Sequence, residues 1–402
     1  MTWLVVGLAA LLLAEKAWRH ALVVRFFRRP VPAAARDPKL VSILQPILSG
    51  DPTLPDCLER NLCLRTRYSV EFVWLVDDDD WEAQRLCRDL AARHPERPVA
   101  VLVLPPPSAQ HNPKTVKLIA GMEAAGGDVV CVLDDDTVLP DGGLEQCLPY
   151  LDRPGVGLAF GLPYYVHFGN LWSSLVSCFV NASSLLTYVP YIALADPFTV
   201  NGMFYAARRD VLAAVGGFAG LEETLADDFA VARRFRAHGW RLAQTPLRHG
   251  IATHVRDLRH YLSLMQRWFV FPRESLLRHL KGRDRVVVYG MGLVANLAPL
   301  LLVVLAAAFP SVPAALAALL YFGYSAAVAA HLNRTFLHGV TPGRALLAVP
   351  LVQILFPVQL LAALVAPQRI VWRGHVMEAE PGGGLRVVRR RTEGGGSGQE
   401  QV

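Results

Sequence analysis

Between residues 40 and 150, short and largely apolar runs alternate with amphipathic stretches. Continuous apolar runs of this length are typical of strands that are buried on both faces, and they occur at 41–48, 71–76, 99–104 and 129–133. Apolar positions with helical spacing occur at 56–65, 82–94, 115–125 and 142–151. Strands that alternate with single helices form parallel sheets, so we expect an α/β domain with a mostly parallel sheet.

The pattern changes after residue 170. Residues 170–195 are apolar and aromatic but contain Asn181 and Pro190, which favours buried or interfacial helices over a membrane span. The stretch 258–280 is amphipathic, basic and aromatic, and such a stretch can lie on a membrane surface. Further elements are expected between them: a strand at 199–205 and helices at 208–215 and 226–238.

Apolar segments at both ends of the sequence predict membrane contact. Segments 286–309 and 313–332 are each long enough to span a bilayer. The shorter run 3–14 is followed at once by charged residues. We expect it to span if these side chains snorkel, and to lie at the membrane interface otherwise. Segment 345–366 contains two prolines. A span there would place the basic tail and the arginines that follow the first segment on different sides of the membrane. We therefore expect a broken, re-entrant or interfacial segment.

These segments divide the chain into parts of different character. We expect a membrane anchor at 1–30, an α/β domain with interfacial helices at 38–280, membrane segments at 285–367 and a disordered tail at 380–402.

Composition and charge support this division. Charged residues make up 18% of the chain and hydrophobic residues 53%, which excludes a disordered chain and argues against a purely soluble one. The net charge of +6 arises partly from arginines beside apolar segments, at 25, 28, 29, 386 and 389–391. Such arginines indicate the cytoplasmic side of a membrane rather than nucleic-acid binding. The six cysteines have no metal-binding spacing and indicate a reducing compartment.

Acidic residues follow two of the expected strands. Asp134 and Asp136 project to the same side of a strand end and could share a hard cation, although a solvated acidic loop has the same pattern. Asp77 begins a run of four aspartates and could bind the base or ribose of a nucleotide. The other three are expected to be solvated. Ligands bind beyond the carboxyl ends of strands in open α/β sheets, so this edge is the expected site.

Three other positions could take part in chemistry. Asp228 could act as a general base, although Asp227 and Asp228 could equally cap a helix. Lys114 begins a helix and could approach a phosphate. Arg267 and Trp268 place a guanidinium, which matches two pyrophosphate oxygens, beside an aromatic ring, although a basic aromatic helix at an interface has the same composition.

In sequence order, these motifs resemble the inverting, membrane-bound glycosyltransferases of the ceramide glucosyltransferase type and their bacterial hopanoid-associated relatives. The matching motifs are VDDDDWE (76–82), HNPKTVKLI (111–119), VLDDDTVLPD (132–141), GLPYYV (161–166), NGMFYAARRDVLAAVGGF (201–218), LADDFAVARRFRAHGWRLA (225–243) and QRW (266–268). The resemblance implies a Rossmann-like GT-A catalytic domain joined to α-helical membrane segments.

The resemblance also implies roles for the residues. Asp77 would bind the nucleotide, Lys114 would lie beside uridine diphosphate, and Asp134 and Asp136 would bind Mn²⁺ or Mg²⁺. Asp228 would be the catalytic base. Arg267 and Trp268 would end a [QR]xxRW motif, whose first position here is Leu264, so Gln266 substitutes from a shifted position or the contact is lost.

The implied protein is a multi-pass enzyme of the cell membrane with a cytoplasmic active site. It would move a sugar, expected to be glucose, from a UDP-sugar to a hydroxyl of a membrane lipid, which the sequence leaves open as ceramide-like, hopanoid or other. A processive polysaccharide synthase shares these motifs but needs a larger membrane channel. Outside the transferases, the alternatives are an inactive membrane scaffold or lipid-binding protein, or a transporter. The retained acids argue against the scaffold, and a lack of repeats argues against the transporter.

Overall fold

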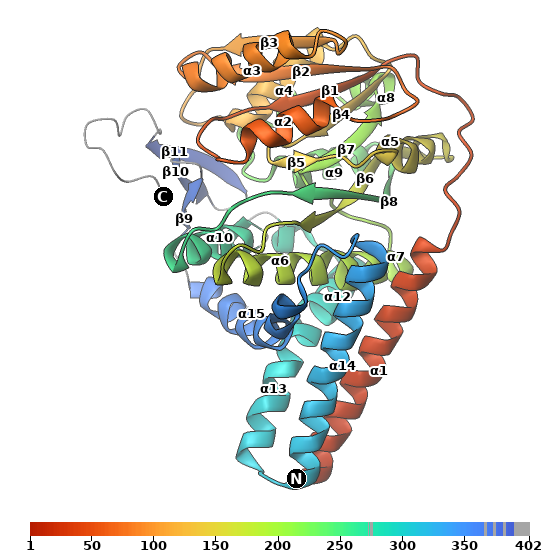
Figure 1. Ribbon diagram of the computed structural model, residues 1–402, viewed down its shortest axis with the longest axis vertical. Helices are drawn as coiled ribbons and strands as arrows, with labels where there is room; N and C mark the ends of the chain where they lie inside the picture. Colours follow the sequence, from red (N-terminus) through yellow and green to blue (C-terminus); the bar gives the residue numbers. More distant parts are fainter. Residues whose placement is uncertain (272, 274–275, 366–367, 373–374, 381–382, 390–402) are drawn as a thin grey trace.

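The computed structural model describes residues 1–271, 273, 276–365, 368–372, 375–380 and 383–389. An eight-stranded sheet in the order β3-β2-β1-β4-β7-β6-β8-β5 lies in the upper part of the molecule in Figure 1. Pairs within β1 to β4 are parallel, as is β6 with β8, whereas β7 is antiparallel to β4 and β6. The strands are β1 Val41–Pro46, β2 Val70–Asp77, β3 Val99–Leu104, β4 Val129–Leu133, β5 Thr137–Val138, β6 Val156–Tyr165, β7 Phe204–Arg208 and β8 Arg241–Ile251.

Helices cover both faces of the sheet because its central strands are apolar on both sides. In β2, Phe72 and Trp74 enter the core on one face, and Val73 and Leu75 enter the core on the other. The first core also contains side chains of α2, α3 and α5, and the second contains side chains of α4, α8 and α9. The bounds are α2 Leu54–Leu62, α3 Trp81–Arg93, α4 Pro113–Ala124, α5 Gly143–Cys147, α8 Arg209–Ala214 and α9 Asp227–Ala237.

The strands and helices expected between residues 40 and 150 are confirmed, with small shifts at their ends. The strand expected at 199–205 is wrong in position, because β7 begins only at Phe204. Polar contacts hold the preceding residues in a loop. Asn201 Nδ2 donates to Gly161 O at 2.6 Å, and Lys114 Nζ donates to Gly202 O at 3.0 Å.

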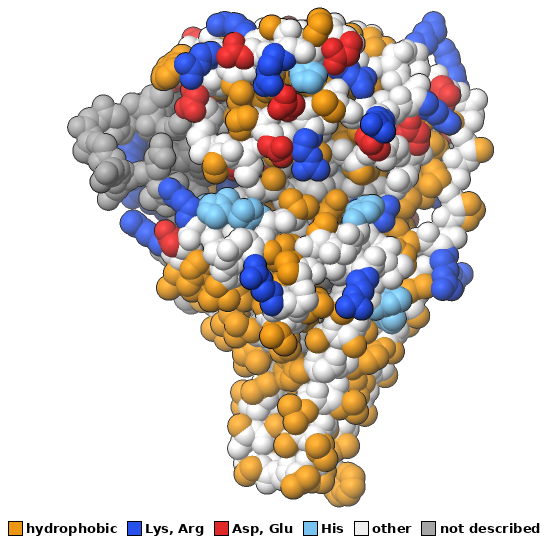
Figure 2. All heavy atoms as spheres, in the orientation of Figure 1, with side chains coloured by type: hydrophobic (Ala, Val, Ile, Leu, Met, Phe, Trp, Pro, Cys, Tyr) orange, Lys and Arg blue, Asp and Glu red, His pale blue; other side chains and the backbone are white. Residues whose placement is uncertain are grey.

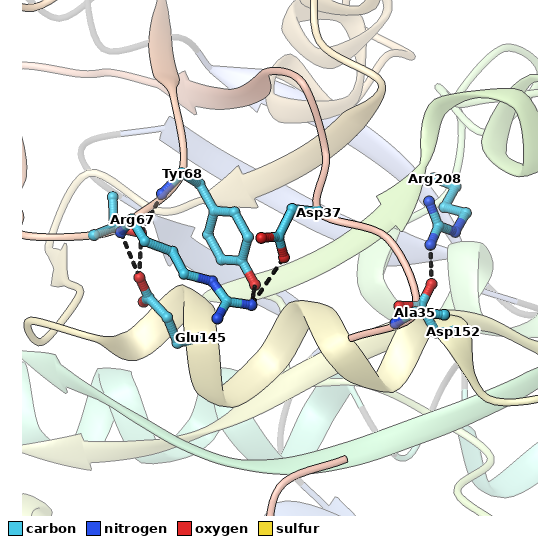
Figure 3. A network of polar contacts seen from close by, with 8 residues as sticks. Ala35, Asp37, Arg67, Tyr68, Glu145, Asp152 and Arg208 are labelled. Atoms are coloured by element: carbon cyan, nitrogen blue, oxygen red, sulfur yellow. Dashed lines mark hydrogen bonds and ion pairs between the residues drawn. The ribbon is translucent and has the colours of Figure 1, made fainter. Parts of the chain in front are cut away.

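A polar network fixes the segment that leads from the first helix into β1 (Figure 3). The amide of Ala35 donates to Asp152 Oδ2 at 2.8 Å, and Asp152 also pairs with Arg208 at the end of β7. Arg67 pairs with Asp37 at 2.8 Å. These contacts bind residues 35–37 of the connecting segment to the sheet domain.

Long apolar helices project from the sheet domain (Figure 1). They are α1 Thr2–Phe27, the continuous helix α12 Gly282–Val288, η4 Tyr289–Val294 and α13 Ala295–Ala308, and α14 Val312–Phe336. Val5 and Leu12 of α1 pack with Leu302 of α13 and Tyr321 of α14. On the face shown in Figure 2, apolar side chains cover the projecting helices, and charged side chains gather over the sheet domain.

Within the described residues, four helical stretches are long and apolar enough to cross a membrane: Leu171–Leu194, Gly282–Ala308, Val312–Phe336 and Gly343–Ala362. The first differs from the others, since 67% of its apolar window is buried inside the protein, against 17% for Gly282–Ala308. It comprises α6 Leu171–Ser183, the π-helical η2 Ser184–Tyr188 and α7 Val189–Leu194. This burial agrees with the expectation of buried helices.

Helix α1 is not among these four stretches, because charged residues interrupt its apolar run. Arg19 does not snorkel as the sequence analysis allows, since its side chain is buried and pairs with Glu15. Its guanidinium donates to Leu186 O in η2 at 2.7 Å and to Met291 O in η4 at 3.3 Å. Arg19 therefore joins α1 to both of these π-helical segments.

The prolines of segment 345–366 do not break it, so the expectation of a broken helix is wrong. After the short 3₁₀ helix η5 Gly343–Leu347, α15 Ala348–Val365 is one helix with Pro357 inside it. Val349 packs with Cys178 of α6 and Leu264 of α10 Leu258–Phe271 in a single apolar cluster. In Figure 1, α15 lies directly beneath α6 and α10.

A small antiparallel sheet follows α15 and consists of β9 Arg369–Trp372, β10 His375–Glu380 and β11 Gly384–Arg389. The expectation of disorder from residue 380 is therefore wrong for 384–389, and residues 390–402 lie outside the described residues. The sheet shares an apolar cluster with Leu225 and Val270. Backbone bonds add to this contact, from Leu225 N to Gly383 O at 2.9 Å and from Val387 N to Ala109 O at 2.7 Å.

Candidate active site

The two acidic motifs lie at one edge of the sheet. Strand β1 pairs in parallel with β2 on one side and with β4 on the other. Asp77 is the last residue of β2, and Asp134 follows the last residue of β4. Because parallel strands end at the same edge, the sheet brings both motifs beside the loop that follows β1.

Two of the acids support this loop. Asp80 accepts the amide of Ser49 at 2.8 Å and also caps α3 through the amide of Ala83 at 3.2 Å. Asp135 accepts the amide of Leu48 at 3.0 Å. Their buried carboxylates are thus bound to backbone amides, while Asp78 and Asp79 are exposed. The expectation that all three acids after Asp77 are solvated is wrong for Asp80.

Asp77 is buried and keeps one oxygen without a partner. Its Oδ2 accepts from Lys117 Nζ at 2.8 Å, and Lys117 also donates to Ile47 O at 3.0 Å. No described group bonds to Asp77 Oδ1. Burial raises the pKa of Asp77, and the charge of Lys117 opposes that rise. The free oxygen is an acceptor that a ligand N–H or O–H can satisfy.

Lys114 lies at the centre of the other acids. Its Nζ is 2.6 Å from Asp134 Oδ1 and 3.4 Å from Asp227 Oδ2. Its side chain is only 11% exposed. Burial disfavours the ammonium charge, but Asp134 and Asp227 outweigh this effect and raise the pKa of Lys114 well above its usual value. Lys114 therefore links the end of β4 to the start of α9.

Asp228 lies beside this cluster, in the first turn of α9. Its Oδ1 accepts its neighbour's amide, Phe229 N, at 2.7 Å. Burial, followed by the charge of Asp227, raises the pKa of Asp228 to about 7. A β-carbon on Gly202 would lie 3.4 Å from both Asp228 Oδ2 and Lys114 Nζ, so the bare backbone of Gly202 lets both side chains approach it closely.

Asp136 and Asp134 fit a hard divalent cation by their chemistry, since both offer carboxylate oxygens at the end of one strand. Asp136 Oδ2 accepts from Thr253 Oγ1 at 2.9 Å, which orients its carboxylate. No group of three or more His, Cys, Asp and Glu in the described part of the chain could hold a metal. The remaining ligands of such a cation would have to come from water or a bound molecule.

The [QR]xxRW region contributes packing as well as charge. Trp268 lies 6.0 Å from the ring of Tyr165 and 6.1 Å from that of Phe179, measured between centroids. Arg267 and Asp136 both exert an electrostatic effect on Tyr165, so both residues lie within electrostatic reach of its ring.

The departure from the motif at Leu264 has a structural explanation. Leu264 is buried in the apolar cluster that joins α6, α10 and α15. Gln266 Nε2 donates to Arg369 O in β9 at 3.2 Å. Gln266 thus binds α10 to the C-terminal sheet through this contact.

The sequence analysis overlooks two residues of the site. Lys117 stands three residues after Lys114 in an otherwise apolar helical turn, and that spacing places both lysines on one face of α4. Tyr205 is buried with no hydrogen bond to its hydroxyl, within electrostatic reach of Asp227 and Lys114. A tyrosine in an apolar strand carries no comparable signal.

Loops near the site are joined to each other and to the C-terminal sheet. Asn112 caps α4 through the amide of Lys114 at 3.0 Å. The amide of Asn112 donates to Glu222 O at 2.6 Å, and its side chain donates to Thr224 O at 3.1 Å. The next residue, Leu225, is bonded to the C-terminal sheet. The start of α4 at Lys114 and the loop that leads to Asp227 are therefore fixed relative to each other.

Comparison with known proteins decides the family. Residues 2–385 match the model of glycosyl transferase family 21. The chain belongs to this family. The resemblance to ceramide glucosyltransferases is thereby confirmed.

Two relatives of the family 21 chain match shorter regions. Ceramide glucosyltransferase 1 of Caenorhabditis elegans is 24% identical over 210 residues, which are 52% of this chain and 44% of that protein. An undecaprenyl-phosphate 4-deoxy-4-formamido-L-arabinose transferase of Pseudomonas fluorescens is 32% identical over 104 residues, which are 25% of this chain and 29% of that protein. Each match spans less than half of the relative's length.

A solved structure shares the fold. The mannosyltransferase PcManGT from Pyrobaculum calidifontis, in complex with GDP-Man and Mn²⁺, superposes with a TM-score of 0.50 at 21% sequence identity. The match covers 88% of the family 21 chain and 99% of the mannosyltransferase. The predicted GT-A fold with α-helical membrane segments is confirmed.

We expect Gly202→Ala to slow sugar transfer without unfolding the protein. Its methyl group would be 3.3 Å from Asp228 Cβ, so the Asp228 side chain must shift by a few tenths of an ångström. Misplacing a reacting group by about 1 Å can cost about 10²-fold in rate, so we expect a smaller loss here. The measurement is kcat together with the thermal unfolding midpoint. Gly343→Ala, in open space, is the control. A folded Gly202→Ala enzyme with unchanged kcat would contradict the close approach.

Proposed function

We propose that this family 21 chain is an inverting, membrane-bound glycosyltransferase. It moves a sugar, expected to be glucose, from a UDP-sugar to a hydroxyl of a ceramide-like, hopanoid or other membrane lipid. The observation that carries the proposal is that Lys114, which pairs with Asp134, and Asp228 both lie close to Gly202 at the carboxyl edge of the sheet. This arrangement supports donor binding and proton removal at one place.

We assign the residues that bind the donor from the partners of their side chains. Asp77, with an unbonded Oδ1, receives a donor group of the base or ribose. Lys114 contacts the diphosphate as a point charge. Asp134 and Asp136 hold Mn²⁺ or Mg²⁺, and such a cation neutralises the charge of a departing diphosphate.

Arg267 adds a planar guanidinium that, like Asp136, lies within electrostatic reach of Tyr165, and this guanidinium can bind two oxygens of the diphosphate. Trp268 fixes the position of Arg267 through its ring contacts with Tyr165 and Phe179. Both residues therefore act on the donor side.

Asp228 is the base of the acceptor half. With a pKa near 7, it is substantially ionised at neutral pH and can still take a proton from an attacking hydroxyl. The hydroxyl oxygen attacks the anomeric carbon from the face opposite the leaving diphosphate, which inverts the configuration. Asp227, the neighbouring residue, forms an ion pair with Lys114 beside this carboxylate.

The acceptor enters from the side of the membrane. Tyr188 at the end of η2 is 43% exposed and within electrostatic reach of Asp228. One turn later, Tyr191 packs against Ala226 and Phe229, which flank the acidic pair of α9. The apolar helix Leu171–Leu194 therefore reaches the proposed base. The names of the relatives, which refer to ceramide and undecaprenyl phosphate, support a lipid acceptor.

The long helices cross the cell membrane, and the catalytic domain faces the cytoplasm. Arg25, Arg28 and Arg29 at the domain end of α1 support this orientation. Cys63 is the one exposed cysteine of the six and tests it. An impermeant maleimide should label Cys63 only after the cells are opened.

The control for this labelling is Thr2→Cys in a Cys63→Ser background. Thr2 begins α1 at the end that lies away from the catalytic domain, so it should be labelled in intact cells. Labelling of Cys63 in intact cells would reverse the proposed orientation.

The proposed activity is tested by product identification. Purified enzyme is incubated with labelled UDP-glucose, UDP-galactose, UDP-N-acetylglucosamine or GDP-mannose and with total membrane lipid. We expect a glycolipid from a UDP-sugar, identified by mass spectrometry, with an inverted anomeric centre. Excess EDTA should abolish the product and Mn²⁺ or Mg²⁺ should restore it, while Asp134→Ala and Asp136→Ala should not respond to either. Full activity in EDTA, or a polymer as product, would overturn the proposal.

We expect Asp228→Asn to lower kcat by about 10²–10⁴-fold, the usual contribution of a general base, with donor affinity retained. In the wild type, kcat/KM should rise with pH through about 7 and then level off, because the carboxylate is the active form. Asp227→Asn removes a neighbouring negative charge, so this rise should move to lower pH. Wild-type kcat in Asp228→Asn would assign the base elsewhere.

A further inference from the structure

Lys114 occupies the position where a cation would be expected. Its ammonium has three N–H donors, and three groups surround it: Asp134 at 2.6 Å, Asp227 at 3.4 Å and Gly202 O at 3.0 Å. Asp134 is one of the two carboxylates that fit a divalent cation. The protein therefore already supplies a positive charge to half of its own metal site.

The ammonium and a divalent cation compete for Asp134. Mg²⁺ and cations like it bind carboxylate oxygens at about 2.0–2.1 Å. An ammonium that is already hydrogen-bonded to the same oxygen occupies the space that the cation needs. Two positive groups on one carboxylate repel each other, and Asp134, with 29% of its side chain exposed, is only partly screened by water. Lys114 must leave Asp134 Oδ1 before the cation can bind there fully.

The protein alone offers little to make a cation displace this lysine. Within the described residues, no cluster of three or more potential ligands exists, so the side chains supply Asp134 and Asp136 and no third ligand of this kind. Mg²⁺ is usually held by one or two carboxylates together with substrate phosphates. A nucleotide diphosphate brings both the missing oxygen ligands and a new partner for the ammonium.

We propose that Lys114 is an internal counter-ion that keeps the divalent cation off Asp134 until a nucleoside diphosphate is present. Building on the proposed function, the diphosphate draws the ammonium away from Asp134, and the cation takes the vacated carboxylate. Cation and nucleotide then bind as a unit, and each raises the affinity of the other by the same factor. When the metal ion is present without the nucleotide donor, Lys114 stays paired with Asp134.

The test measures Mn²⁺ binding rather than turnover. Purified full-length protein is titrated with Mn²⁺ with and without UDP, and free Mn²⁺ is read from its electron paramagnetic resonance signal. In the wild type, UDP should tighten Mn²⁺ binding by about 5–150-fold, the usual range of coupling between two sites. In Lys114→Met, Mn²⁺ alone should bind at least about fivefold more tightly than in the wild type, and the gain from UDP should shrink.

Two variants serve as controls. Lys117→Met removes a lysine of the same helix that pairs with Asp77 instead of Asp134, so Mn²⁺ binding without UDP should stay as in the wild type. Asp134→Asn should abolish specific Mn²⁺ binding, which shows that the measured site is the one described. Thermal unfolding checks each variant, and Lys114→Gln replaces Lys114→Met if the latter does not fold.

The outcomes separate this proposal from the proposed function. If Lys114→Met fails to tighten Mn²⁺ binding while Asp134→Asn abolishes it, the exchange of cations is overturned and the metal site stands. If Asp134→Asn leaves Mn²⁺ binding with UDP unchanged, the metal assignment in the proposed function fails as well. Tight Mn²⁺ binding by the wild type without UDP also overturns the exchange.

Discussion

Burying several carboxylates at one edge of a sheet is the constraint that shapes this site. Such groups are stable only if amides or cations compensate them. The chain uses both: Asp80 and Asp135 accept backbone amides of the loop after β1, whereas Asp77 and Asp134 pair with lysines. Both lysines come from α4, so one helix serves both acidic strand ends. The oxygen to which no described group bonds, Oδ1 of Asp77, marks where a ligand is needed.

Much of the fold could be predicted from the sequence. Apolar runs such as 129–133 form buried strands because a parallel sheet covered on both faces requires them, and the acids that follow therefore had to share an edge. Helix α9 was equally clear from its spacing. These elements depend on local pattern, which a single sequence displays.

Other features depend on distant contacts that no local pattern reveals. The segment before Phe204 reads as a strand, yet its groups bond to Gly161 and Lys114, which lie far away in the sequence. Strand β11 reads as part of a polar tail, yet its Val387 joins Leu225 and Val270 in one apolar cluster. The roles of Asp80 and Asp135 were hidden for the same reason, since identical residues in one run have different partners.

The loops beside the site depend for support on the C-terminal sheet, which is made late in synthesis. Its strands are bonded to the loop at Ala109 and to Leu225, which precedes the acidic pair of α9. During synthesis, the ribosome makes the GT-A domain first, then α12 to α15, and only then β9 to β11. The loops beside Lys114 and Asp227 gain their final support after the apolar helices have been made and can insert. A chain that has not yet formed β9 to β11 therefore lacks the backbone bonds that support the loops beside Lys114 and Asp227.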